Sequence, residues 1–295
     1  MDTVVSIDIV GDPGPTVERG AIDRAFGWFS AVESACTRFD PTSELMRLCA
    51  TIGSPVRVSP ILFEVVRFAL AVARLTAGAF DPTVGGLMEA RGFNRSYRTG
   101  LRTASAMAEG QQPTYRDVEV DETAHAITLH RPLVVDLGAV AKGFAIDLAA
   151  RELAGTGGYA IDAGGDISVR GRRGDGSPWR VGVRHPAQPD ALWCILQPED
   201  AAICTSGGYA RRIDALEHHL LDPRTGRSPR DLVSTTVVAP SAMLADALST
   251  AAFVLGPEAG LRLLARQGVD GLTLDRAITP AMTAGFAGMI ERRSP

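Results

Sequence analysis

The sequence contains no run of apolar residues long enough to cross a membrane, and only four of its 295 residues are cysteine. Because a spanning helix needs about 20 predominantly apolar residues, no membrane span is predicted. The cysteines show no CxxC spacing, so no zinc site is predicted, and Cys36 and Cys194 lie in apolar patterns typical of small core residues. The net charge of −4 argues against a nucleic-acid partner.

Internal repeats, low-complexity segments and linkers are also lacking, and so are the GxGxxG and Walker-type glycine patterns of nucleotide-binding loops. Hydrophobic residues make up 45% of the chain and charged residues 22%, which is the balance of a soluble globular protein. The length suffices for a sizeable core. We expect one domain over residues 1–295, or two closely packed α+β lobes without a linker.

The N-terminal sequence MDTVVSIDIV has the pattern of a β-strand. It lacks the charged region and apolar segment of a signal peptide, and no lipid-anchoring cysteine follows it. We therefore expect a cytoplasmic protein, or an exported one if the sequence starts after a removed leader.

The stretch Val134–Gly171 is expected to organise the rest of the chain. Val134-Val135 predicts a short strand, Ala139–Leu153 has apolar residues at helical spacing, and Tyr159–Asp162 predicts a second strand. Glycine turns follow both strands, and one of them opens the helix, where backbone N–H groups and the helix dipole attract anions. Lys142 would add a cation there. The alternative is two ordinary turns with a surface lysine.

Helices and antiparallel strands are mixed along the chain, which favours an α+β fold with mainly antiparallel sheets packed with helices. Residues 79–87 are expected to form a loop, and residues 94–113 a polar insertion with one helix near 105–109. The other expected helices are 17–39, 44–49, 61–76, 241–255 and 258–267. The other expected strands are 3–10, 56–58, 116–120, 126–130, 167–170, 180–184, 191–197, 202–206, 210–213, 218–221, 234–239 and 271–274.

Two oxygen-bearing side chains share one face of a predicted helix, because Asp246 and Thr250 are four residues apart. A carboxylate and a hydroxyl are hard donors suited to Mg²⁺, which usually also keeps waters and substrate phosphates. A backbone carbonyl near Ala139 would complete such a site. The alternative is a hydrogen-bonded Asp–Thr pair on the helix surface.

Two adjacent histidines, His218 and His219, precede an Asp-Pro turn at Asp222. Neighbouring residues of a strand face opposite sides, so at most one histidine serves a site. Imidazole is the usual general base for a hydroxyl nucleophile near neutral pH. The alternative is a structural or surface histidine. Upstream, Thr205-Ser206-Gly207 offers hydroxyls and amides that suit a phosphate or a ribityl chain, and a plain β-bulge is equally compatible with it.

Blocks of the sequence resemble, in order and over nearly the whole chain, the motifs of the FAD:protein FMN transferases of the ApbE type. The block VVDLGAVAKGFAID is similar to the family's DLGgiAKGyavD, and YAIDAGGDISVRG is similar to its nlGGDi-x-x-G. The other matching blocks are MDTVVSIDI, FDPTSELMRLC, FDPTVGGL, ICTSGGYARRI, HHLLDPRTGRSP and TTVVAPSAMLADALSTAAFVLG.

The resemblance implies an α+β enzyme with an FAD cleft that takes FAD as its substrate. With Mg²⁺ or Mn²⁺ it would transfer FMN to a Thr or Ser hydroxyl of an acceptor protein and release AMP. The implied metal ligands are Ala139, Asp246 and Thr250, and the implied catalytic residues are His219, Lys142 and Asp222. The expected FAD-binding residues are Met1, Thr3, Ser43, Glu44, Asp81, Thr83, Asp136, Gly164, Gly165, Asp166, Thr205, Ser206 and Gly207.

The sequence departs from the family pattern at four positions. Asp2 replaces a usual Gly, Cys49 a usual Asn, Gly86 a common Pro, and Gly208 a usual Asp. The proposed metal pair and the histidine block are intact, so an active enzyme is expected. Two other functions use the same residues: an FAD pyrophosphatase that yields FMN and AMP, and a flavin-binding protein without catalysis.

Overall fold

The computed structural model describes residues 3–11, 19–96, 99–103, 105, 112–188, 190–209 and 217–291. Its strands are β1 (Val5–Val10), β2 (Val56–Arg57), β3 (Val118–Asp121), β4 (Ala126–Leu129), β5 (Gly158–Ala163), β6 (Asp166–Gly171), β7 (Val181–Arg184), β8 (Leu192–Leu196), β9 (Ala201–Gly207), β10 (Leu232–Ala239), β11 (Asp270–Asp275) and β12 (Pro280–Met282). Its helices are α1 (Arg19–Cys36), α2 (Glu44–Cys49), α3 (Pro60–Leu75), α4 (Gly85–Ala90), α5 (Ala141–Glu152), α6 (Ala242–Leu255), α7 (Pro257–Arg266) and α8 (Ala284–Met289).

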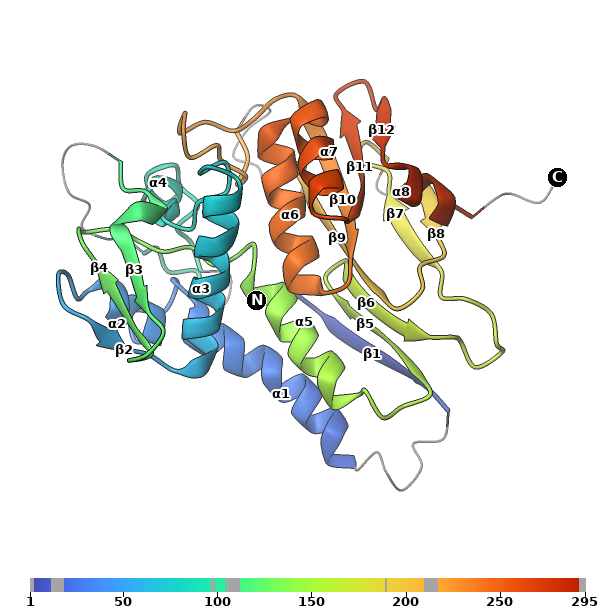
Figure 1. The fold of residues 1–295 in the computed structure, drawn as a ribbon, viewed down its shortest axis with the longest axis horizontal. Coiled ribbons are helices and arrows are strands. Elements are labelled where there is room, and N and C mark those ends of the chain that lie inside the picture. Colours follow the sequence, from blue (N-terminus) through green and yellow to red (C-terminus); the bar gives the residue numbers. More distant parts are fainter. Residues whose placement is uncertain are drawn as a thin grey trace.

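A seven-stranded antiparallel sheet forms the centre of the fold, in the order β1-β5-β6-β9-β10-β11-β12 (Figure 1). A three-stranded sheet, β2-β4-β3, and a two-stranded sheet, β7-β8, accompany it. The predicted α+β fold with mainly antiparallel sheets is therefore confirmed. Whether residues 1–295 act as one domain or as two lobes stays a prediction.

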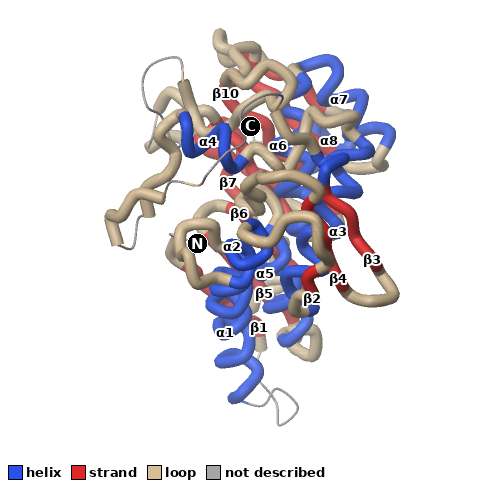
Figure 2. Tube along the Cα trace, turned by 90° about the vertical axis from the view of Figure 1, so that its left-hand side faces the viewer, coloured by secondary structure: helices blue, strands red, loops and turns tan. Residues whose placement is uncertain are grey.

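The two faces of the large sheet bury different cores because strand side chains alternate. Cys204 and Val237 face the core beneath the helices, whereas their neighbours Ile203 and Val238 face a second core that includes β7, β8 and α8. Figures 1 and 2 both place α1 and α5 side by side. The sheet therefore fixes β9 between a helical layer and a small β layer.

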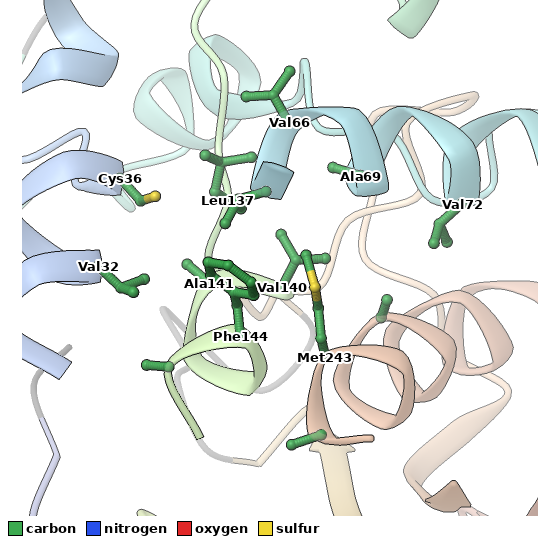
Figure 3. Close-up of a cluster of buried hydrophobic side chains, with 14 of the residues drawn as sticks. Val32, Cys36, Val66, Ala69, Val72, Leu137, Val140, Ala141, Phe144 and Met243 are labelled. Carbon is green, nitrogen blue, oxygen red and sulfur yellow. The ribbon is translucent and has the colours of Figure 1, made fainter. Parts of the chain in front are cut away.

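Helices from distant parts of the chain meet over the first core. Val32 of α1, Val66 of α3, Phe144 of α5 and Met243 of α6 converge on one apolar cluster (Figure 3). Because these side chains are buried at positions with helical spacing, the helices are held in place mainly by apolar burial. This packing sets the start of α5 beside the start of α6.

The contact between α5 and α6 depends on a glycine. A β-carbon at Gly143 would lie 2.5 Å from the carbonyl carbon of Ala242 and 2.6 Å from the Cα of Met243. Both atoms belong to the backbone, so neither can rotate away.

We expect Gly143→Ala to lower the free energy of unfolding by about 1–3 kcal/mol, the usual cost of overpacking. The control is Gly27→Ala, another helical glycine, where an added β-carbon meets nothing within 4 Å. It should raise stability by about 0.5–1 kcal/mol, because alanine is the better helix former. Urea unfolding of both variants measures the two effects, and equal stabilities would contradict this account of the helix contact.

Three predictions of local structure are wrong. Val134-Val135 forms only a single bridge, from Val134 to Val84, because the neighbouring segment turns into α4 at Gly85. For the same reason residues 79–87 are not all loop. The segment 218–221 is not a strand, since the Ser228 hydroxyl satisfies both the N–H and the carbonyl of His218. The 3₁₀ turn Tyr115–Asp117 and the elements β12 and α8 were not predicted.

Most other elements agree with prediction to within a few residues, and α2 agrees at both ends. Ser43 and Ser241 cap α2 and α6 through their hydroxyls, as such residues do at helix N-termini. The predicted helix near 105–109 and the predicted strand 210–213 fall on residues that the structure largely or wholly leaves undescribed. Within the described part of the chain, no helix has both the length and the apolar character needed to span a bilayer.

Candidate active site

Three charged side chains meet where α5, β6 and α6 come together. Lys142, in the first turn of α5, forms an ion pair with Asp166 at the start of β6. Its Nζ also lies 3.9 Å from Oδ2 of Asp246 on α6. All three residues were expected site residues, but their pairing was not predicted. Asp166 lies 24 positions and Asp246 lies 104 positions after Lys142 in the sequence. The pairing creates a group of two buried carboxylates and one partly exposed ammonium.

The charge balance of this group favours a cation. The three side chains sum to −1 when ionised, and Asp246 Oδ2 is buried without a hydrogen-bond partner among the described residues. Burial raises the pKa of Asp246, while Lys142 and a backbone hydrogen bond from Gly143 lower it. A buried carboxylate oxygen without a hydrogen-bond partner is costly. A divalent cation bound to that oxygen would remove the cost.

The oxygen donors of this group suit a hard cation such as Mg²⁺ or Mn²⁺. No group of three or more His, Cys, Asp or Glu side chains that could hold a metal occurs within the described ranges. A cation here would therefore depend on Asp246, on hydroxyl and carbonyl oxygens, and on substrate phosphates, as Mg²⁺ sites commonly do. Thr250 lies one turn beyond Asp246 on α6. Ala139 lies in the turn that leads into α5, and its role as a ligand stays a prediction.

Asp147 was not predicted as a site residue, yet it sets the position of Asp246. Its Oδ1 accepts a hydrogen bond from the Ala242 N–H (2.7 Å), and its Oδ2 accepts one from the Met243 N–H (3.0 Å). The carboxylate of α5 thus caps the N-terminus of α6, where the helix dipole favours negative charge. The block VVDLGAVAKGFAID contained this residue, but only the fold shows which amides it meets.

The glycine turn between β5 and β6 has the backbone shape that the sequence predicted. Gly164 and Gly165 have φ angles of +66° and +92°, which favour glycine. The N–H of Gly165 donates to Asp162 Oδ1 (2.7 Å), and a β-carbon on Gly164 would collide with Thr3. Thr3 and this turn, both expected to contact FAD, are therefore neighbours. Met1 lies outside the described residues.

Asp136 is fixed by a buried arginine. Its Oδ2 accepts from Arg38 Nε (2.5 Å) and its Oδ1 accepts from the Gly138 N–H (2.9 Å). Arg38, which is 3% exposed, also donates to the carbonyl oxygen of Phe93 (2.6 Å). Asp136 therefore orients the glycine turn before α5. No local pattern in the sequence signals Arg38, because its partners are distant in the chain.

Asp81 and Thr83 are buried and shape their own loop. One carboxylate oxygen of Asp81 accepts from the N–H and the hydroxyl of Thr83, and the other accepts from the Tyr115 N–H. Burial raises the pKa of Asp81, and these hydrogen bonds lower it. The Pro82 carbonyl accepts from the Asp136 N–H (2.7 Å), so this loop adjoins the glycine turn. Their expected contact with FAD stays a prediction.

Ser43 and Glu44 also have structural partners. The Ser43 hydroxyl donates to the Thr37 carbonyl (2.6 Å) and accepts from the Met46 N–H. Glu44 accepts hydrogen bonds from the N–H and the hydroxyl of Ser59, the residue that caps α3. These contacts join α2 to α3, and they leave the expected flavin role of both residues as a prediction.

Thr205 and Ser206 of β9 face opposite sides of the sheet. The Thr205 N–H donates to Asp166 Oδ1 (3.4 Å), and its hydroxyl bonds that of Thr236 (2.9 Å). The Ser206 hydroxyl bonds that of Thr250 (3.0 Å). The end of β9 thus contacts the ion-pair group through Asp166 and the predicted metal pair through Thr250.

The two histidines differ in burial. His218 is buried, with Nε2 at 3.0 Å from the Pro229 carbonyl oxygen and its ring edge-on to Phe253. His219 is only half-buried. His219 is therefore the histidine with more access to solvent. Asp222 closes the following turn and binds Arg224 through both carboxylate oxygens (2.8 and 3.0 Å).

The histidine segment is tied to the loop of Asp81. Arg91 Nη1 donates to Glu217 Oε2 (2.5 Å), and a β-carbon on Gly226 would contact Leu87. Figure 1 shows the described segment before β10, residues 217–231, passing beside α4. These contacts place the histidine segment next to α4, and the shared site of all the predicted residues stays a prediction. By contrast, a groove of about 410 Å³ on the other sheet face, between Asp8 and Trp179, contains none of them.

Gly208 is the departure from the family pattern with a visible structural reason. A β-carbon there would lie 2.8 Å from Cδ2 and 3.0 Å from Nε2 of His218. His218 occupies the space that a side chain at position 208 would need.

We expect Gly208→Ala to lower the free energy of unfolding by about 1–3 kcal/mol through overpacking. Combining it with His218→Ala should cost less than the sum of the two single variants, because the clash is then absent. Denaturant unfolding of the four proteins in the cycle measures this coupling. Strict additivity would contradict the proposed contact.

A model of the ApbE family matches residues 1–273, and the chain belongs to this family. The FAD:protein FMN transferase of Vibrio cholerae is 30% identical over 270 residues, which cover 88% of this chain and 81% of the relative. The Escherichia coli K12 protein of the same name is 32% identical, over 80% of this chain and 69% of the relative. The Rhodobacter capsulatus protein of the same name is 33% identical, over 82% of this chain and 48% of the relative, so the chain spans about half of that relative.

Solved structures agree with this assignment. The flavin transferase ApbE of Vibrio cholerae superposes with a TM-score of 0.84 at 27% identity, covering 98% of this chain and 96% of the other. The ApbE protein of Thermotoga maritima gives 0.83 at 27% identity, covering 99% and 100%. The expected ApbE-like fold is therefore confirmed.

Proposed function

We propose that this protein is an FAD:protein FMN transferase that acts with Mg²⁺. The observation that carries the proposal is the buried Asp246 Oδ2, which lies 3.9 Å from Lys142 Nζ and has no hydrogen-bond partner among the described residues. The names of the relatives support the same activity. Asp246, Thr250 and the Ala139 carbonyl would hold the cation. When bound, Mg²⁺ would offset the negative charge that builds on the pyrophosphate oxygens.

The remaining work falls to the chain's own residues. The acceptor hydroxyl oxygen attacks the phosphorus on the FMN side, the bond to the bridging oxygen breaks, and AMP leaves with that oxygen. His219 is the candidate base for the hydroxyl proton, because it is the more accessible histidine. Lys142 is already held by Asp166, so its ammonium is fixed in place before the substrate arrives. Preorganised charge of this kind is effective in catalysis.

The acceptor is proposed to be a protein that presents a Thr or Ser hydroxyl. This part of the proposal rests on the names of the relatives and on the family resemblance. The chemistry is compatible with water in place of the hydroxyl, which would make the protein an FAD pyrophosphatase. A flavin-binding protein without catalysis would leave FAD intact.

Product analysis separates these functions. Purified protein is incubated with FAD and Mg²⁺, with and without an acceptor domain from the same genome, and AMP and free FMN are quantified by chromatography. Transfer predicts that AMP release needs the acceptor and exceeds free FMN. Equal amounts of AMP and free FMN without acceptor would favour the pyrophosphatase. FAD that binds to the protein but stays intact would leave only the flavin-binding function.

A further inference from the structure

Four oxygen atoms form a continuous chain of hydrogen bonds between β9 and α6. The Ser249 hydroxyl donates to the main-chain carbonyl of Asp246 (2.9 Å). The Ser206 hydroxyl lies 2.7 Å from that of Ser249 and 3.0 Å from that of Thr250. Ser206 and Ser249 are 8% and 0% exposed, so protein atoms rather than bulk water set the direction of these bonds.

Counting protons fixes the direction of the whole chain. A carbonyl oxygen only accepts, and each hydroxyl has a single proton to donate. Ser249 gives its proton to the Asp246 carbonyl, so its oxygen accepts from Ser206. Ser206 has then used its proton and accepts from Thr250. The Thr250 proton therefore points at Ser206, and the remaining lone pairs of Thr250 are available for a cation.

We infer that Ser206 and Ser249 are positioning residues that orient the Thr250 hydroxyl as an oxygen donor to the divalent cation. The inference rests on the metal site of the proposed function. It also gives Ser206, which was expected among the FAD contacts, a role that acts through Thr250. Partners of metal ligands commonly orient them in this way, and their loss typically lowers metal affinity about 10–100-fold.

The structure supplies a matched control for removing the Ser206 hydroxyl. Thr235 of β10 lies directly opposite Ser206 in the strand register. Its hydroxyl is also buried but has no hydrogen-bond partner in the described part of the chain. Thr235→Val therefore removes a neighbouring buried hydroxyl of the same sheet without touching the hydrogen-bond chain.

The test is a titration of the full chain with Mn²⁺, followed by electron paramagnetic resonance, in the absence and in the presence of FAD. We expect Ser206→Ala and Ser249→Ala to weaken Mn²⁺ binding about 10–100-fold, and Thr235→Val to bind as the wild type does. In the transfer assay, high Mg²⁺ should restore the rate of Ser206→Ala toward the wild-type value. It should not restore Asp246→Asn, which lacks the ligand itself.

The outcomes separate this inference from the proposed function. Wild-type Mn²⁺ affinity in Ser206→Ala, or an equal loss in Thr235→Val, would overturn the orienting role while leaving the transferase intact. A second outcome is that the wild type binds Mn²⁺ but transfers no FMN, while Ser206→Ala binds Mn²⁺ more weakly. This outcome would support the orienting role and refute the proposed transferase function. A wild type that binds no Mn²⁺ under either condition would overturn the orienting role as well.

Discussion

Replacing Asp246 by asparagine is expected to abolish metal-dependent FMN transfer while leaving the protein as stable as the wild type or more so. The carboxylate is buried, its pKa is raised by burial, and one of its oxygens has no hydrogen-bond partner within the described residues. An amide of the same shape removes the cost of a buried charge. Lys142 keeps its ion pair with Asp166. Activity and stability should therefore change in opposite directions.

The expected loss of transfer rate is more than about 100-fold, since losing even a partner of a metal ligand costs about 10–100-fold. Asp147→Asn is the matched control, because that half-buried carboxylate also has a pKa raised by burial but caps α6 with both oxygens. The amide group can accept only one of the two N–H bonds, so about 1–3 kcal/mol of stability should be lost. Initial rates and urea unfolding of both variants measure the contrast. If Asp246→Asn unfolds more easily and transfers FMN normally, the carboxylate is structural.

Replacing His219 by glutamine is expected to slow FMN transfer about 10²–10⁴-fold, the usual contribution of a general base. FAD affinity should change little, because the base acts on the acceptor hydroxyl. Replacing His218 by glutamine should instead lower stability, since its ring packs on Phe253 and its Nε2 meets the Pro229 carbonyl.

Single-turnover rates at saturating FAD, together with FAD binding followed by flavin fluorescence, separate the two histidines. Fast transfer by a well-folded His219→Gln variant would exclude it as the base. Slow transfer by a well-folded His218→Gln variant would assign the role to the buried histidine instead.

Local patterns in the sequence were sufficient for much of the fold. Helix caps such as Ser43 and Ser241 act on amides three residues away, so they can be read without the fold. Apolar spacing likewise located α5 and α6, and alternation located most strands of the large sheet. The strand predictions for residues 134–135 and 218–221 were wrong. Val134 forms only one bridge, and the Ser228 hydroxyl bonds the N–H and the carbonyl of His218 in place of a neighbouring strand.

The sequence proposes residues for the candidate site, but it does not show how they are connected. The Asp246–Thr250 spacing follows from helix geometry. Other contacts join residues far apart in the chain, as Arg38 joins Asp136 and Asp147 joins the start of α6. The hydroxyl chain through Ser206 likewise depends on β9 packing against α6. Such pairings are set by tertiary packing, so no local pattern signals them.

The most direct test of the proposed function is the intact mass of an acceptor domain after incubation with this protein, FAD and Mg²⁺. The proposed function predicts a covalent FMN adduct on the acceptor, absent when EDTA replaces Mg²⁺ and absent with Asp246→Asn. Replacing the modified Thr or Ser of the acceptor by alanine should also abolish the adduct. An adduct that forms equally in EDTA or with Asp246→Asn would contradict a metal-dependent transferase centred on this carboxylate.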